Sequence, residues 1–502
     1  MSEHHHATAI APAGSRTPFA AKLAQLARLA PERPLVTCGE QTLTRAEFES
    51  RTNRLARAYQ AWGVSEGSFV TVALPNGIEF LEAVVAIWKA GATPQPVSHR
   101  LPERELLAII ELAQPALTVG IEVPGRPGVP AGYRPDGTLS DARLPDLISP
   151  SLKAPTSGGS TGRPKLIVST EEAVVESLTP LGQLMGLQAE GTALATGPLS
   201  HNAPLLTATA ALFLGCHVVV MERFDAADAL RLVRHHGADW MYAVPTMLSR
   251  IAALADKERE AADVSSLRTV ITMAASSSPA VREFCLDFFG PDVMLELYAA
   301  TEAQAVALID GHGWRDRPGS VGRVVIGELK VRDASGAPLP TGQVGELWVR
   351  RGPNKPGPYR YIGSEPQQAA DGWETVGDLG RLDQDGYLYL IDRKSDMIIV
   401  GGLNIYPAEV EAALEEHPLI DTACVVGLPD PDFGQVVHAV LNVTGEVDDE
   451  VLLAHLRERL VAYKLPRSFE RRDLPLRDEA GKLRRSRIAQ EAAPATREQP
   501  AH

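Results

Sequence analysis

The chain has 502 residues, a formal net charge of −14 and 44% hydrophobic residues. At roughly 100–200 residues per domain, this length predicts about three folding units with large cores. The acidic balance argues against a nucleic-acid-binding surface. The four cysteines are scattered without a CxxC pair, which indicates neither a disulfide framework nor a zinc ribbon and favours buried thiols in a reducing cytoplasm.

Membrane and export segments are not expected. The longest apolar stretch, residues 207–221, is interrupted by Gly215 and His217, whereas a membrane-spanning helix needs about 20 apolar residues. The N-terminus lacks the apolar core of a signal peptide. We therefore predict a cytoplasmic protein without a membrane span.

The first half of the chain alternates helical and strand patterns. Thr44 and Glu47 have the spacing of a capping box and predict a helix start. A strand over 69–74 and a helix over 78–90 follow. Such alternation predicts parallel βαβ units, with further short strands at 218–220, 240–244 and 270–273.

The pattern changes after about residue 319. Short β-rich runs separated by Gly, Asp and Pro predict a smaller β subdomain, with strands at 328–331, 345–349, 387–391 and 397–400. From Pro407 the pattern becomes α+β, with helices at 408–416 and 448–461 and strands at 423–427 and 437–443. The polar segment 489–502 predicts a disordered tail.

Residues 156–165, Thr-Ser-Gly-Gly-Ser-Thr-Gly-Arg-Pro-Lys, predict a phosphate-binding loop. Glycines let the backbone approach an anion closely, and hydroxyls and two cations add donors. It is not a Walker loop, because Arg163 and Pro164 separate the last glycine from Lys165. The alternative is a flexible linker, which the strand-like 166–168 disfavours.

Two further clusters suit a nucleotide. In the segment 297–302, Thr301 offers a hydroxyl to phosphate and Glu302 offers a carboxylate to Mg²⁺. Asp378 lies between glycines and could accept both hydroxyls of a ribose. Each acid alone also fits an ordinary loop.

Residues 464–487 carry nine cations against four anions, which favours an anionic ligand over the alternative of a solvated basic face.

Together with Asp-Arg-Lys-Ser-Asp-Met-Ile at 392–398, Gly-Gly-Leu-Asn-Ile-Tyr-Pro at 401–407 and Gly-Lys at 481–482, these segments resemble the adenylate-forming superfamily. This superfamily comprises acyl- and aryl-CoA ligases, firefly luciferase and peptide-synthetase adenylation domains, and the resemblance spans residues 44–488. It implies an α/β fold: a large N-terminal domain of doubly wound α/β halves plus a β subdomain, with a small mobile α+β C-terminal domain. The implied boundaries are 1–394, including the β subdomain at 319–394, then 395–488 and the tail 489–502.

The resemblance also implies roles for individual residues. Lys482 would bridge the substrate carboxylate and the α-phosphate, where a cation stabilises developing charge; Thr301 would contact the α-phosphate and Glu302 would bind Mg²⁺. Ser395 would be the hinge, although the family usually has Asp or Lys there, and Gly401 and Gly402 would line the coenzyme A tunnel. The implied ATP-binding residues are Thr156, Ser157, Gly158, Gly159, Ser160, Thr161, Gly162, Lys165, Ala274, Ala275, Ser276, Tyr298, Asp378 and Arg393.

The segment 197–204 lacks the acid with which amino-acid-activating domains bind an ammonium group, and it is similar to the pocket wall of CoA ligases. His201 would then gate the acyl pocket; the alternative is a structural histidine. The small alanines favour a bulky acid. The segments 158–167 and 201–204 are most similar to bacterial bile-acid and related acyl-CoA ligases. The expected pocket residues are His201, Tyr242, Val244, Met273, Ala299 and Ala300.

The function that this resemblance implies is ATP-dependent activation of a carboxylic acid to an acyl-adenylate, followed by transfer to coenzyme A with release of AMP and pyrophosphate. The alternatives are an enzyme that loads a carrier protein and a silent nucleotide-binding relative. We expect ATP, Mg²⁺ and coenzyme A as cofactors and co-substrates and a small carboxylic acid as substrate. A homodimer is left open.

Overall fold

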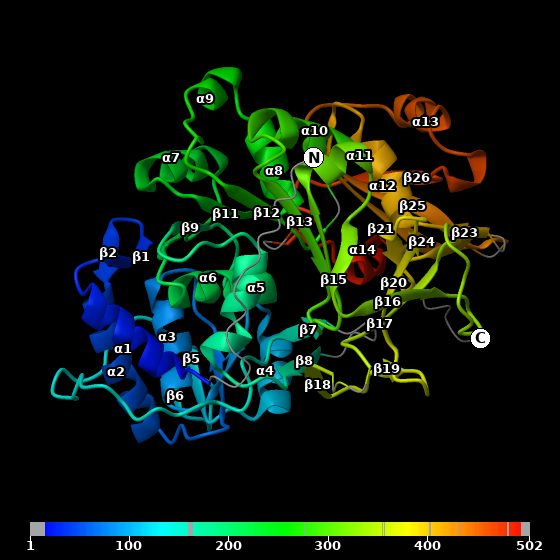
Figure 1. Ribbon diagram of the computed structural model, residues 1–502. Coiled ribbons are helices and arrows are strands. Elements are labelled where there is room, and N and C mark those ends of the chain that lie inside the picture. The colour runs from blue at the N-terminus through cyan, green and yellow to red at the C-terminus, as the bar shows by residue number, and fades with distance from the viewer. Residues whose placement is uncertain are drawn as a thin grey trace, which may run out of the picture.

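The structure, a computed structural model, describes residues 16–158, 164–275, 277–353, 355, 357–400, 403–430, 432–478 and 481–492. The first helices lie at the lower left of Figure 1 and the last strands at the upper right. The helices are α1 (Phe19–Leu29), α2 (Arg45–Ala61), α3 (Ile78–Lys89), α4 (Glu103–Ala113), α5 (Thr179–Leu184), α6 (Asn202–Phe213), α7 (Ala226–His236), α8 (Pro245–Ala252), α9 (Asp256–Glu260), α10 (Pro279–Phe288), α11 (Gly311–Asp316), α12 (Pro407–Glu415), α13 (Asp449–Arg457) and α14 (Arg485–Ala492).

A large mixed sheet runs through the molecule. Its parallel part is β1 (Pro34–Cys38), β10 (His217–Val220), β9 (Thr192–Ala195), β11 (Trp240–Ala243), β12 (Thr269–Thr272) and β13 (Met294–Ala299), with β2 (Gln41–Thr44) antiparallel at the edge. The antiparallel part continues from β13 through β14 (Val306–Asp310), β15 (Gly322–Ile326), β21 (Tyr387–Arg393), β20 (Glu374–Leu382), β17 (Gly345–Arg350) and β16 (Glu328–Arg332), while β19 (Gln367–Gln368) pairs with β20. The β-rich segment thus hydrogen-bonds onto the α/β sheet.

Smaller sheets complete the fold. A parallel sheet contains β4 (Thr93–Pro96), β3 (Phe69–Val72), β5 (Leu117–Gly120) and β6 (Gly128–Pro130). A three-stranded sheet joins β18 (Tyr359–Ile362), β8 (Pro164–Ser169) and β7 (Thr156–Gly158). The last part of the chain holds the hairpin β22 (Ile398–Val400) and β23 (Leu403–Ile405) and the sheet β24 (Ile420–Asp430), β25 (Gly434–Val443) and β26 (Ser468–Arg471).

The predicted capping box at α2 is confirmed. The Thr44 hydroxyl accepts from the Glu47 backbone N–H at 3.2 Å, and the Glu47 carboxylate accepts from the Thr44 N–H at 2.8 Å. These contacts satisfy two donors that a helix start leaves unpaired.

The core of the first half is built around α3, in which every residue except Glu79 is buried. A helix that is apolar on every side belongs inside a protein. The ring of Phe19 from α1 lies 4.5 Å from Trp88 of α3 and 4.1 Å from Phe213 of α6, measured between centroids. These aromatic contacts pack α1, α3 and α6 against one another.

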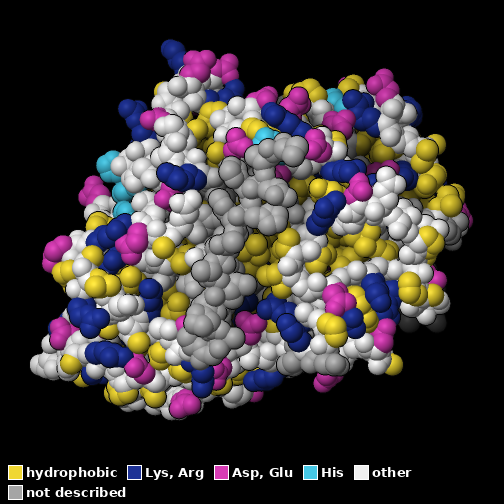
Figure 2. Space-filling model, in the orientation of Figure 1, with side chains coloured by type: hydrophobic (Ala, Val, Ile, Leu, Met, Phe, Trp, Pro, Cys, Tyr) yellow, Lys and Arg dark blue, Asp and Glu magenta, His cyan; other side chains and the backbone are white. Residues whose placement is uncertain are grey.

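The cysteines are as expected: all four are unpaired, and Cys216, Cys285 and Cys424 are buried. No helix in the described ranges is long and apolar enough to cross a membrane. On the face in Figure 2, basic and acidic side chains intermingle, so the net negative charge is dispersed there.

The predicted start of the disordered tail was wrong by four residues, because α14 continues to Ala492. Ile488 is buried in a cluster with Cys424 and Val426 of β24, and Ala489 packs against that cluster. Burying this apolar face stabilises the helix beyond the point where the composition turns polar.

Candidate active site

The predicted acyl-pocket residues gather at one edge of the large sheet. Strands β9, β11, β12 and β13 are parallel neighbours, so their carboxyl ends meet at one edge, which is where open α/β sheets bind ligands. Val244 follows β11, Met273 follows β12, and Ala299 ends β13. His201 lies further along from β9, directly before α6.

Tyr242 packs beneath the loop that follows β9. Its side chain is buried, and a Cβ placed on Gly197 would come within 2.7 Å of its ring. The loop that leads to His201 therefore packs directly on Tyr242, and Gly197 is required by that close approach.

Two non-glycine residues at the same edge have left-handed backbones. Ala274, predicted to pack adenine, has φ 78°, and Ala303, in the turn after β13, has φ 53°. Such conformations cost about 1–3 kcal/mol each and cluster at functional sites. The Ala303 turn is held by a backbone hydrogen bond to Ala300 at 3.0 Å and by Arg351, which donates to the Ala303 carbonyl at 3.2 Å.

Glu302 lies buried in that turn and faces the strand that follows the predicted phosphate loop. Its carboxylate accepts from the Tyr361 hydroxyl at 2.5 Å, and Lys165 Nζ of β8 lies 3.6 Å from the same oxygen. Lys165 Nζ also stands 3.8 Å above the centre of the Tyr361 ring. Burial lowers the pKa of Lys165, and Glu302 opposes that shift.

Asp378 on β20 brings two predicted nucleotide residues together. Its carboxylate accepts from the Tyr298 hydroxyl at 2.6 Å and forms an ion pair with Arg393, whose Nε lies 3.2 Å away. Burial and the neighbouring carboxylate raise the pKa of Tyr298 well above its usual value, so the phenol stays neutral and donates. The charge of Asp378 raises the pKa of Arg393.

Lys482 reaches this group from the C-terminal part of the chain. The turn before it closes when its own N–H donates to the Asp478 carboxylate at 3.0 Å. A Cβ on Gly481 would lie 3.3 Å from Val244, so the turn packs against the pocket edge. Burial, and then Arg393, lower the pKa of Lys482, while Asp478, Glu302 and Asp378 oppose the shift.

His201 faces the same turn. Burial lowers its pKa to about 4, with Asp478 opposing and Lys482 and Arg484 adding to the shift. Its imidazole is therefore neutral at physiological pH. The structure thus brings His201, Val244 and the Lys482 turn together.

The family model described as "AMP-binding enzyme" matches residues 23–146 and 154–356, and "AMP-binding enzyme C-terminal domain" matches residues 409–482. The chain belongs to the AMP-binding enzyme family. The predicted adenylate-forming resemblance is confirmed.

Individual relatives of this AMP-binding enzyme are CoA ligases. Feruloyl-CoA synthase of Amycolatopsis sp. is 32% identical over 482 residues, covering 92% of this chain and 96% of its own. The 2-succinylbenzoate–CoA ligase of Bacillus licheniformis is 30% identical, covering 93% and 98%. The Bacillus subtilis o-succinylbenzoate coenzyme A synthetase in complex with ATP and magnesium has a TM-score of 0.81 at 26% identity, covering 94% and 100%. The predicted α/β fold with a large N-terminal and a smaller C-terminal domain is confirmed.

The segment around Ser395 lies between two differently anchored residues of this AMP-binding enzyme. Lys394 Nζ contacts Glu346 of β17 at 3.1 Å, and its N–H donates to Gly377 at 2.8 Å. Asp396 is bound instead by Arg485 of α14 at 2.9 Å. Ser395 itself is exposed and donates to Asp396 at 3.0 Å.

Several predicted residues fall outside the described ranges or are described in part. Thr156 begins β7 opposite Leu166, and Thr301 and Ala275 are half-buried at the sheet edge. Ser157 and Gly158 are described as backbone of β7. The residues outside the described ranges are Gly159, Ser160, Thr161, Gly162, Ser276, Gly401 and Gly402.

The carboxylate oxygens of Glu302 are suitable ligands for the Mg²⁺ that the family resemblance implies. Within the described ranges no three His, Cys, Asp or Glu residues cluster as a metal cage. Mg²⁺ is usually bound by one or two carboxylates together with substrate phosphates. A single buried carboxylate beside Lys165 suits that mode of binding.

The basic segment of this enzyme differs from its expected role. Seven of its nine cations form ion pairs with carboxylates, for example Lys464 with Glu409 at 2.6 Å and Arg485 with Glu411 at 2.5 Å. Local pairing neutralises most of the surplus charge, so the segment is not a broad anion-binding face. Lys482 has no carboxylate within ion-pair distance among the described residues.

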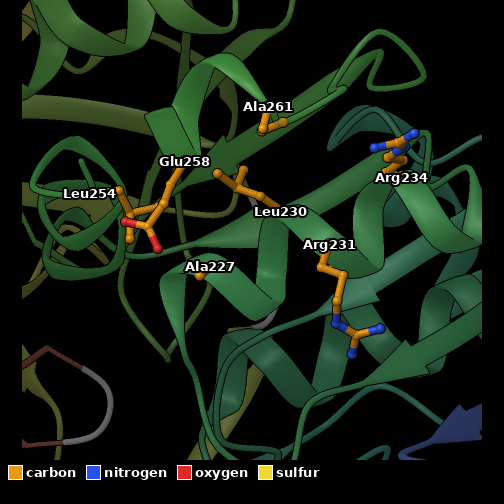
Figure 3. A pocket seen from close by; sticks show the side chains of 8 residues that line it. Ala227, Leu230, Arg231, Arg234, Leu254, Glu258 and Ala261 are labelled. Carbon is orange, nitrogen blue, oxygen red and sulfur yellow. The ribbon is translucent and has the colours of Figure 1, made fainter. Parts of the chain in front are cut away.

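The described surface includes a small cavity at the site and a larger hollow away from it. A small cavity of about 10 Å³ is bordered by Tyr298, Ala300 and Glu302. A larger open hollow of about 240 Å³ lies between α7 and the α8–α9 region, where Leu230 lies beside Leu254 and Glu258 while the Arg231 guanidinium points away from them (Figure 3). The larger hollow contains none of the predicted site residues.

Sequence reasoning missed three residues at this site. Tyr361 binds Glu302, Asp478 holds the Lys482 turn, and Lys153 is buried beside Asn202. Tyr361 carried no signal in the sequence, since its partner Glu302 is distant along the chain. Asp478 lies only four residues before Lys482, but one acid within a basic segment does not by itself indicate a turn contact. Lys153 did carry one, because it is a lone charge shortly before the glycine-rich loop.

Proposed function

We propose that this protein is an ATP-dependent carboxylic acid–CoA ligase that forms an acyl-adenylate and then an acyl-CoA thioester. The observation that carries the proposal is the position of Lys482. It lies within electrostatic range of Glu302, Asp378 and Arg393 and packs beside the pocket edge at Val244. An exposed cation beside the predicted nucleotide site and the pocket edge suits attack of a carboxylate on a phosphate.

The first step joins two anions. The substrate carboxylate oxygen attacks the α-phosphorus of ATP, and the bond to pyrophosphate breaks. Lys482 stabilises the charge that develops on the α-phosphoryl oxygens. Mg²⁺ at Glu302 would supply further neutralisation of phosphate charge. Asp378 would bind the ribose hydroxyls, and Tyr298 and Arg393 hold its carboxylate in place.

The second step needs a thiol where Lys482 lies. The thiol sulfur attacks the acyl carbon of the adenylate, AMP leaves, and the thiol proton is lost to solvent. Ser395 would allow the C-terminal part to turn away, because Lys394 stays bound to β17 while Asp396 moves with α14.

The substrate is best described as a bulky aromatic or alicyclic carboxylic acid. The pocket edge carries the small side chains Ala299 and Ala300, and segment 197–204 has no acid to bind an ammonium group. The relatives named for feruloyl and 2-succinylbenzoate substrates support an aromatic acid. A bile-acid or steroid substrate, a cytoplasmic location and the absence of a nucleic-acid partner stay predictions.

A pyrophosphate-release screen tests this function. Aromatic, alicyclic, fatty and amino acids are supplied with ATP and Mg²⁺, with and without coenzyme A. We expect turnover with cyclic acids and acyl-CoA formation when coenzyme A is present. If none of the acids gives turnover, the proposed enzymatic activity is refuted. Formation of acyl-adenylate without any CoA thioester would favour a carrier-protein acceptor.

A further inference from the structure

Lys153 is a buried cation that the mechanism above does not use. Its side chain is 7% exposed, and its ammonium group has one hydrogen-bond acceptor in the described structure, Asn202 Oδ1. No carboxylate in the described ranges lies within ion-pair distance of it. Buried lysines are rare unless they are paired.

Lys89 shows what a structural buried lysine looks like in this same chain. Its ammonium donates to Glu49 at 2.5 Å, to Thr52 at 2.8 Å and to Asn53 at 2.7 Å. A carboxylate and two neutral acceptors thus satisfy the charge of Lys89. Lys153 lacks such a set, so its charge is available to a ligand.

Strand register puts Lys153 on the same side as Lys165. In the β7–β8 ladder Ser157 faces Lys165. The pairing continues beyond β7, because Ile167 donates to the Pro155 carbonyl and Ser169 donates to the Lys153 carbonyl, each at 2.9 Å. Side chains alternate across a strand, so Lys153 and Lys165 belong to the face that meets Glu302.

Electrostatics agree with this placement. Burial lowers the pKa of Lys153 to about 8, and Glu302 and Glu171 oppose the shift. An anion with several charges that bound here would relieve the desolvation of the ammonium group. Lysine is a common point-charge donor to phosphate oxygens.

We propose that Lys153 is a second phosphate-binding cation, which together with Lys165 binds the β- and γ-phosphates of ATP and the pyrophosphate product. The inference rests on the proposed function for its ligand. Lys153 lies before the glycine-rich loop 156–165, so the phosphate-binding motif itself gives it no role. Asn202 keeps the ammonium group in place beside the pocket helix α6.

Calorimetric binding to the full chain, without any acid substrate, tests the assignment. Lys153→Gln removes the charge but can still donate to Asn202, and Lys153→Met removes both. We expect both variants to bind Mg²⁺–ATP and pyrophosphate at least about tenfold more weakly, which is the effect of losing one charge-assisted contact. AMP affinity should stay within about twofold of wild type, because AMP has neither phosphate.

Lys89→Met is the matched control: it should lower the melting temperature and leave ATP affinity unchanged. Unchanged ATP affinity in Lys153→Gln, or equal weakening of ATP and AMP, would overturn the assignment, as would a raised KM for the acid alone. Wild type that binds ATP but converts no acid would refute the proposed function and leave the Lys153 result standing.

Discussion

Tyr298 donates its hydroxyl hydrogen to Asp378 across 2.6 Å and so joins the end of β13 to β20. The two strands are separated in the sheet by β14, β15 and β21. The contact links the parallel part of the sheet, which carries the pocket edge, to the antiparallel part, which carries Arg393. The predicted nucleotide site is therefore shared between both parts of one sheet.

Replacing Asp378 by Asn should weaken ATP binding. The amide cannot accept from Arg393 and Tyr298 with the strength of a carboxylate, and it loses charge-assisted bonds to the ribose. We expect the KM for ATP to rise about tenfold or more, with little change in the KM for the acid. Tyr298→Phe, which keeps the carboxylate, should have a smaller effect; a larger effect of Tyr298→Phe would contradict the ribose role of Asp378.

Glu302 has a matched control in Glu374. Each carboxylate accepts from a tyrosine of β18, Glu302 from Tyr361 at 2.5 Å and Glu374 from Tyr359 at 2.7 Å. Glu302→Gln should raise the Mg²⁺ concentration needed for half-maximal activity about tenfold or more, because a charged ligand is lost. In Mg²⁺ titrations Glu374→Gln should behave as wild type, and equal shifts in the two variants would count against a metal role for Glu302.

Ser395→Pro should separate the two steps. The ring restricts the backbone at the point between Lys394, bound to Glu346, and Asp396, bound to Arg485. We expect adenylation at a rate close to wild type and slower thioester formation from supplied acyl-adenylate. Ser395→Gly keeps the backbone free and should support both steps, so a loss in Ser395→Gly would show that the side chain, not the pivot, matters.

His201 should make the fold acid-sensitive. Burial holds its folded pKa at about 4, below the unfolded value near 6.5, so between these values the unfolded chain binds the extra proton. Stability from this group is therefore complete above about pH 6.5 and falls as the pH drops toward 4. Melting temperatures at pH 7 and pH 5 should differ more for wild type than for His201→Gln; equal differences would show that His201 is not desolvated.

Much of the fold was predictable because its rules are local. The capping box of α2 depends on residues three apart, and the strands that end at Ala243 and Thr272 are short apolar runs bounded by turns. The continuation of the β-rich segment into the main sheet was not predictable. It depends on pairing between β14 and β15 and between β15 and β21, which is set by register across distant segments.

The candidate site divides in the same way. Glu302 and Asp378 were found because each lies in a motif of small residues, and Lys482 was found through the family resemblance. The structure places Glu302 beside Lys165 and Asp378 beside Tyr298. Tyr361 and Lys153 act through partners about 50 to 60 residues away, Glu302 and Asn202. The basic segment was overestimated, because counting charges along the chain does not reveal pairs such as Arg485 with Glu411.

The central claim is that Lys482 serves adenylation alone, and the two half-reactions of Lys482→Ala measure it most directly. Rapid-quench assays would follow acyl-adenylate formation from acid and ATP and, separately, acyl-CoA formation from supplied acyl-adenylate. The account predicts that adenylation falls about 10²–10³-fold while thioester formation stays near the wild-type rate. An equal loss in both steps, or no loss in adenylation, would contradict it.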